Sequence, residues 1–219
     1  MESKISFERL LIFFVGFIFI LICIRFIYTG KFNYIFLLWN IFLAWIPFII
    51  SPLFKRLASQ PKWMQGLVFF SWMVFFPNAL YVVTDLVHLE TESSVPKWYD
   101  TVLLFSSSVV ALMMAFISLL RVEAFLKQKF KISFVEPMVI GILFLGSFGV
   151  YLGRFLRWNS WDIIRNPFAL AIEIANQVIF PFQHFRTWGI TMILTILFYL
   201  LYLAIKKMPG YLHRTTSYQ

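Results

Sequence analysis

Four side chains that could do chemistry recur along one apolar stretch near the middle of the chain. They are an amide, a phenol, a carboxylate and an imidazole: Asn78, Tyr81, Asp85 and His88. Spacings of three, four and three residues place such groups on one face of a helix. Because unpaired polar groups are costly in lipid, that face must meet protein or water. The pattern indicates either a substrate or ion site or a polar network that packs helices together.

A second group of charged side chains follows a later apolar stretch. Arg154 and Arg157 stand close to Trp158 and Trp161. An Arg side chain can bind a phosphate or a carboxylate through two hydrogen bonds at once. The alternative is that these Arg side chains reach lipid headgroups beside a belt of aromatic rings. If a helix continues through this segment, Arg154, Arg157, Trp161 and Arg165 share one face.

Asp85 and His88 are also the candidates for catalysis. An imidazole can accept and release a proton near neutral pH, and a nearby carboxylate can orient it. Together with His184, the pair supplies two imidazoles and a carboxylate, a ligand set that suits a catalytic zinc with an open position. A pair at this spacing also arises by chance. We therefore predict no metal and no other cofactor, and keep these three residues as the metal candidates.

The composition indicates what must position these side chains. Hydrophobic residues make up 61% of the 219 residues and charged residues only 13%, whereas a soluble domain carries about 25% charged residues. The excess apolar surface needs lipid as its solvent. The net charge of +9 does not indicate nucleic-acid binding, because the basic residues lie in short clusters between apolar runs, as they do around membrane helices. The lone Cys23 cannot form an internal disulfide.

Six stretches are long enough to cross a membrane, since a helix needs about 20 apolar residues for a core of about 30 Å. They are 8–28, 34–54, 64–87, 99–120, 132–153 and 187–206. The run 167–180 is too short to span and predicts an interfacial or re-entrant helix, with Asn166 as its cap and Pro167 at its first position. The fold class is therefore all-α: a polytopic bundle that forms one membrane domain over residues 1–219.

The distribution of Lys and Arg between the spans favours both termini in the cytoplasm. In that orientation, the candidate ligand-binding residues lie near the outer leaflet, although they come from several spans. They are Asn40, Asn78, Tyr81, Asp85, His88, Asp100, Arg154, Arg157, Asn159 and Asp162. We expect some of the Arg side chains to pair with the aspartates of this set. The convergence predicts a polar pocket that faces outwards.

Three motifs carry a resemblance to a known family: FPNALYVVTDLVHL at 76–89, WYD at 98–100 and YLGRFLRWNSWD at 151–162. Together they resemble an uncharacterised family of bacterial multi-pass membrane proteins, described only as a domain of unknown function. The resemblance covers about residues 35–205 and implies a small protein of the bacterial cytoplasmic membrane. It implies no catalytic residues, but it places Pro77 and all but Tyr81 of the candidate residues at motif positions.

Three functions stay open at this point. The favoured hypothesis is binding or transport of an anionic small molecule or lipid headgroup in the outward-facing pocket, held by Arg154 and Arg157. The second is a membrane-embedded enzyme that acts on a lipid-linked substrate through His88. The third is a structural or accessory subunit. Membrane lipids are the expected partners, nucleic acid is not, and protein partners, energy source and oligomeric state are left open.

Overall fold

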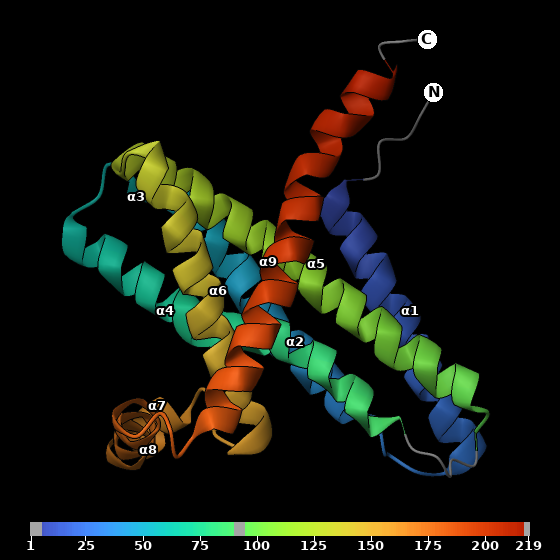
Figure 1. The fold of residues 1–219 in the computed structure, drawn as a ribbon. Coiled ribbons are helices and arrows are strands. Elements are labelled where there is room, and N and C mark those ends of the chain that lie inside the picture. Colours follow the sequence, from blue (N-terminus) through green and yellow to red (C-terminus); the bar gives the residue numbers. More distant parts are fainter. Residues whose placement is uncertain (1–5, 90–94, 217–219) are drawn as a thin grey trace.

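The computed structural model describes residues 6–89 and 95–216, and all regular structure in these segments is helical. The elements are α1 (Phe7–Thr29), α2 (Phe36–Ile50), η1 (Ser51–Leu53), α3 (Phe54–Leu57), α4 (Lys62–Tyr81), η2 (Val82–His88), α5 (Lys97–Lys129), α6 (Ile132–Phe155), α7 (Asp162–Arg165), α8 (Pro167–Ile179) and α9 (Phe185–Thr216). Six helical stretches are long and apolar enough to cross a membrane. Each of them coincides with a predicted span, so the six-span bundle is confirmed (Figure 1).

Helix α5 forms the centre of the bundle and contacts α1, α2, α4 and η2. In α5, 67% of the apolar membrane-spanning stretch is buried inside the protein, compared with 17% in α1. Small buried residues such as Ser107 and Ser118 let neighbouring backbones approach this helix closely, and their hydroxyls are satisfied by carbonyls of α5 itself. The peripheral helices therefore leave most of their apolar surface for lipid.

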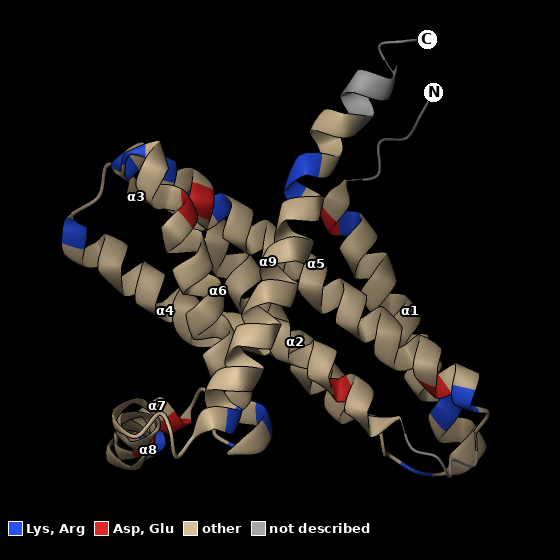
Figure 2. Cartoon of the chain, viewed as in Figure 1, with Lys and Arg blue, Asp and Glu red and all other residues tan. Residues whose placement is uncertain are grey.

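Most charged residues lie toward the ends of the long helices, and the middle parts of these helices carry few of them (Figure 2). At one end, Glu123 is buried and binds Lys127 and Lys206, both at 2.7 Å, together with the hydroxyl of Tyr202. At the opposite end lie the candidate residues that the sequence singled out. This arrangement is what a bilayer requires, because charge at its centre is costly.

Helices α4 and α6 cross at a close contact between Pro77 and Gly149. A Cβ atom added to Gly149 would lie 2.7 Å from Cγ of Pro77 and 2.8 Å from its Cβ, closer than non-bonded carbons approach. The absent side chain is thus what allows the two backbones to meet. Away from this crossing, the two helices diverge toward their other ends (Figure 1).

Substitution of Gly149 by Ala should therefore destabilise the bundle by about 1–3 kcal/mol, the usual cost of overpacking. The Pro77 ring cannot rotate out of the way, so α4 and α6 must shift apart. Thermal unfolding in detergent measures the effect. Gly16→Ala is the matched control, because a Cβ at Gly16 would meet no atom within 4 Å. Equal melting temperatures for the two variants would contradict the close crossing.

The predicted short helix is present as α8, and Figure 1 shows it nearly end-on, crosswise to α9. It begins at Pro167 as expected, but the side chain of Asn166 makes no capping hydrogen bond, so that detail was wrong. The expectation of a continuous helical face from Arg154 to Arg165 was also wrong. Helix α6 ends at Phe155, and Arg157 has a left-handed backbone with φ of 61° that turns the chain away.

Candidate functional site

Arg154, in the last turn of α6, organises a polar cluster at one end of the bundle. Its Nη1 donates to the hydroxyl of Tyr81 at 2.9 Å and to Oδ1 of Asp85 at 3.2 Å. Its Nη2 donates to the backbone carbonyl of Thr84. The Arg154 side chain is 13% exposed and that of Asp85 only 1%. The guanidinium is therefore held in place by a buried counter-ion and by two neutral acceptors.

Asp85 extends this cluster, which we call the Arg154 cluster, to a third span. Its second oxygen, Oδ2, accepts a hydrogen bond of 2.7 Å from Nδ2 of Asn40 in α2. Both carboxylate oxygens thus have a strong donor, which a buried charge requires. Asn40, Asp85 and Arg154 join α2, η2 and α6, and these three residues were predicted to converge.

The local backbone explains why Tyr81, Asp85 and His88 all reach Arg154. After Pro77, α4 ends at Tyr81 and the chain continues as the 3₁₀ helix η2. Side chains three residues apart lie above each other in a 3₁₀ helix, so Asp85 and His88 point the same way. Nε2 of His88 lies 3.1 Å from Nη1 of Arg154. A guanidinium only donates, so in a hydrogen bond between the two this nitrogen is the acceptor. The ring packs edge-on against Phe36, with 5.2 Å between the ring centroids.

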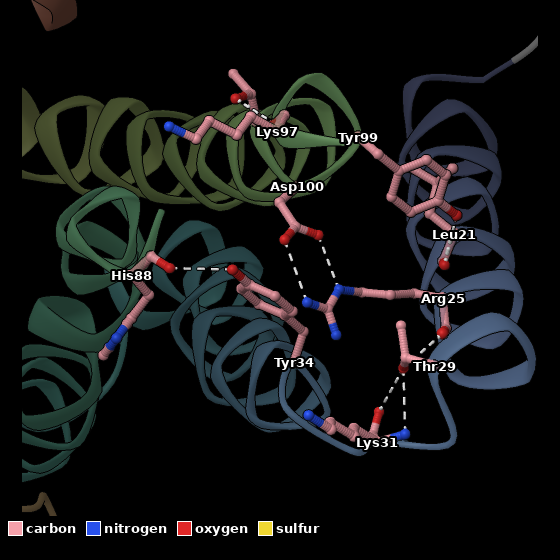
Figure 3. Close-up of polar contacts among 10 residues, drawn as sticks. Leu21, Arg25, Thr29, Lys31, Tyr34, His88, Lys97, Tyr99 and Asp100 are labelled. Atoms are coloured by element: carbon pink, nitrogen blue, oxygen red, sulfur yellow. Dashed lines mark hydrogen bonds and ion pairs between the residues drawn. The ribbon is translucent and has the colours of Figure 1, made fainter. Parts of the chain in front are cut away.

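A second buried ion pair joins α1 to α5, and it was not expected (Figure 3). Nε of Arg25 lies 2.8 Å from Oδ1 of Asp100, and its Nη2 lies 3.2 Å from Oδ2. Arg25 is 4% exposed and Asp100 1%. Asp100 therefore pairs with Arg25, and not with one of the later Arg residues that were expected to pair with the aspartates. A sequence signal was available, because an Arg inside an apolar span needs a partner.

Tyr34 connects the two ion pairs. Its ring lies under the Arg25 guanidinium, with 4.3 Å from Cζ to the ring centroid. Its hydroxyl donates to the backbone carbonyl of His88 at 3.0 Å, and Figure 3 shows Tyr34 between the two groups. Through Tyr34 and His88, one polar network runs from α1 to α6.

The remaining candidate residues lie in or beside the segment after α6. Nδ2 of Asn78 donates to Oγ of Ser160 at 2.8 Å, so this amide fastens the segment to α4 and does not touch Arg154. Oδ2 of Asp162 accepts from the backbone N–H of Asn159 at 2.7 Å, which closes a local turn. Arg157 is exposed, and it makes no hydrogen bond or ion pair with any residue that the structure describes.

A small cavity of about 80 Å³ lies where this segment meets α4 and α6. Its polar lining comes from Asn78, Tyr81, Asn159 and Ser160. A water molecule takes about 30 Å³ of liquid volume, so the space admits a few waters or one small polar group. Tyr81 belongs both to this cavity and to the Arg154 cluster.

The three metal candidates do not come together. Within residues 6–89 and 95–216, no three His, Cys, Asp or Glu side chains are grouped closely enough to hold a metal ion. Asp85 and His88 lie at the Arg154 cluster, and His184 belongs to the turn before α9. A zinc site built on these three residues would need a different arrangement.

Gln177 is a buried polar residue that the sequence did not single out as a link between helices. Its Nε2 donates to Glu173 at 2.7 Å, and its Oε1 accepts from the hydroxyl of Thr187 at 2.6 Å. Its backbone carbonyl accepts from the indole N–H of Trp188 at 3.1 Å. These bonds fix α8 against the start of α9. In the sequence, Gln177 stands four residues after Glu173, and such a polar face on a short helix suggests exposure to water.

Comparison with known families identifies the chain. Residues 39–201 match the family described as "Protein of unknown function (DUF1361)". The chain belongs to this family. The matched region includes every residue of the Arg154 cluster, the Asn78–Ser160 contact and α8, and it leaves out Arg25 and Tyr34. No curated protein matches the chain, and no solved structure matches it. The family description thus assigns no activity, and the multi-pass membrane architecture rests on the six apolar helices.

Proposed function

We propose that the chain binds an anionic group at the end of the bundle that carries the Arg154 cluster, with Arg157 as the contact residue. The observation that carries this proposal is the state of Arg157. Its side chain is exposed and is not engaged by any described residue. Arg154, three residues earlier, differs in this respect, because its charge is balanced by Asp85. A free guanidinium beside such a cluster suits a phosphate or carboxylate.

The backbone of Arg157 supports the same proposal. Arg157 is the one non-glycine residue with positive φ among the described residues. The left-handed conformation costs a residue with a side chain about 1–2 kcal/mol, and glycine adopts it freely. Strain of this kind is concentrated at functional sites. A role of the Arg157 side chain in ligand binding would explain why this position holds Arg and not Gly.

A second cation lies near the end of α6. The guanidinium of Arg186 packs over the ring of Phe155, with 5.3 Å from Cζ to the centroid, and Phe155 is two residues before Arg157. The cavity lined by Asn78, Asn159 and Ser160 adjoins the same turn and offers amide and hydroxyl groups. An anionic group held by Arg157 could place a polar substituent there. We infer a phosphate- or carboxylate-bearing ligand, free or as a lipid headgroup.

Arg154 takes a different role from the one that the sequence suggested. Its charge is balanced by Asp85, so we propose that Arg154 holds the site in shape and does not bind the ligand. We favour binding over catalysis because the His88 ring is engaged by its neighbours: Nε2 lies 3.1 Å from Nη1 of Arg154, and the ring packs edge-on against Phe36. Transport would require an opening of the same cluster.

Substitution of Arg157 by Ala should weaken binding of inorganic phosphate or of short-chain phosphatidylglycerol about 10- to 100-fold. That range corresponds to the loss of about 1.5–3 kcal/mol for hydrogen bonds to a charged group. Isothermal titration calorimetry on purified protein measures both ligands, and the ligand that binds in the wild type identifies the source of the anion. Arg165→Ala is the control, because Arg165 is an exposed Arg of the same segment.

Arg157→Gly separates binding from stability. Glycine relieves the left-handed strain, so the variant should unfold at the same temperature as the wild type or slightly above it, although it loses the ligand. If Arg157→Gly and Arg157→Ala bind phosphate and phosphatidylglycerol as tightly as the wild type, the proposed site does not exist. Equal losses for Arg165→Ala would indicate general charge attraction and would also contradict it.

A further inference from the structure

A large cavity lies far from the Arg154 cluster, in the opposite half of the bundle. It is a groove of about 900 Å³ between the first half of α4, the last turns of α5 and the first half of α6. Its walls are apolar, with Phe69, Phe125, Met138, Ile142 and Leu145 among them. The groove is open to the surface of the bundle, since Gly66, Gly141 and Leu145 in its lining are exposed.

The groove follows from the crossing of α4 and α6. The two helices meet at Pro77 and Gly149 and diverge from there (Figure 1). Along the diverging parts, Gly66 on α4 and Gly141 on α6 line the groove, and a Cβ at either position would meet no atom within 4 Å. Glycine here does not serve close packing, as it does at Gly149. These two positions instead leave the groove open.

The end of the groove that lies farthest from the crossing of Pro77 and Gly149 is basic. Lys62 at the start of α4 and Lys129 at the end of α5 both line it, and no Asp or Glu is among its lining residues. Nζ of Lys129 donates to the carbonyl of Ala58 at 2.8 Å. An ammonium group has three donors, so Lys129 retains capacity for a second acceptor. A long apolar groove with cations at its end has the chemistry of an anionic lipid: acyl chain inside, phosphate outside.

We propose that this groove holds an acyl chain of an anionic phospholipid, with the lipid phosphate at Lys62 and Lys129. In the orientation that the charge distribution predicts, the lipid comes from the cytoplasmic leaflet, where basic residues attract anionic lipids. This site is separate from the anion site at Arg157, and neither proposal depends on the other.

Native mass spectrometry of the purified, delipidated chain tests the proposal. The probes are phosphatidylglycerol and phosphatidylcholine with identical acyl chains, added in equal amounts. We expect one phosphatidylglycerol to be retained in preference to phosphatidylcholine. Gly141→Leu and Gly66→Leu fill the groove and should reduce retention of both lipids at least ten-fold. Gly189→Leu is the matched control, since Gly189 also has open space around it but lies on α9.

The charge is tested separately with Lys62→Gln and Lys129→Gln. Each change should reduce the preference for phosphatidylglycerol over phosphatidylcholine about five-fold, while the retention of phosphatidylcholine stays the same. Lys207→Gln, an exposed Lys of α9 outside the groove, should leave the preference unchanged. These variants decide the matter even if a leucine variant does not fold.

Three results would overturn the proposal. The first is equal retention of the two lipids by the wild type. The second is a leucine variant in the groove that binds lipid as the wild type does, or a loss of the same size in Gly189→Leu. The third is a dimer mass that persists in detergent and disappears in Gly141→Leu, because a second copy of the chain would then be the occupant.

Discussion

Replacing Arg154 with Ala is expected to destabilise the protein by about 3–5 kcal/mol, the usual cost of removing one partner from a buried ion pair. Asp85 would remain in a position where 1% of its side chain is exposed, with Asn40 as its remaining donor. The carbonyl of Thr84 and the hydroxyl of Tyr81 would also lose a donor. Unfolding in mixed micelles, followed by circular dichroism, measures the change in free energy.

The double variant Arg154→Gln with Asp85→Asn provides the control for this experiment. It removes both charges and keeps groups that can form hydrogen bonds, so it should be more stable than Arg154→Ala. Removing one partner of a buried pair costs more than replacing both, because only the single change leaves an uncompensated charge. Arg157→Ala, only three residues away but exposed, should change the free energy of unfolding by about 0.5 kcal/mol or less. An Arg154→Ala variant as stable as Arg157→Ala would show that the ion pair does not support the bundle.

Replacing Asp100 with Ala should have an effect of similar size at the other ion pair. Arg25 would keep its charge at 4% exposure and would lose both of its hydrogen bonds to the Asp100 carboxylate, while its contact with the Tyr34 ring would remain. Removing the carboxylate partner of a buried Arg is costly whether the surroundings are protein or lipid. We expect a loss of about 3–5 kcal/mol and a detachment of α1 from α5, which cysteine cross-linking between these helices would detect.

Two comparison variants make this second prediction specific. Arg25→Leu combined with Asp100→Leu removes both charges and should recover most of the stability, because apolar residues can replace a buried pair. Asp162→Ala removes a carboxylate that caps a local turn and should cost only about 1 kcal/mol. If Asp100→Ala and Asp162→Ala unfold alike, the contact between Arg25 and Asp100 contributes little to the fold.

The two ion pairs and Tyr34 give the bundle a rigid polar end. Functional groups are best held by elements whose own side chains are locked by packing and hydrogen bonds. Arg157 follows soon after such an element, since α6 ends at Phe155 and its Arg154 is bound to Asp85, which Asn40 of α2 also holds. The proposed anion contact therefore sits on a rigid support. The groove at the other end lacks comparable packing, which suits an occupant that can exchange with the bilayer.

Much of the candidate site could be predicted from the sequence because it depends on local periodicity. Tyr81, Asp85 and His88 recur at helical spacing, and all three contact the same guanidinium. The Arg-rich segment was expected near them because topology places both at one side of the membrane. The continuation of that segment as a helix was wrong, since a left-handed turn at an Arg has no sequence signal comparable to a glycine.

The sequence by itself determined that this protein has six apolar spans, one short helix that does not span, and a polar end. Length and hydropathy suffice for these features, because lipid imposes them on each segment independently. Only the tertiary structure decided that Asp85 pairs with Arg154 and Asp100 with Arg25, and that a groove opens between α4 and α6. Pairing depends on how helices rotate and cross. A few close contacts, such as Pro77 against Gly149, set those crossings, and no single segment contains that information.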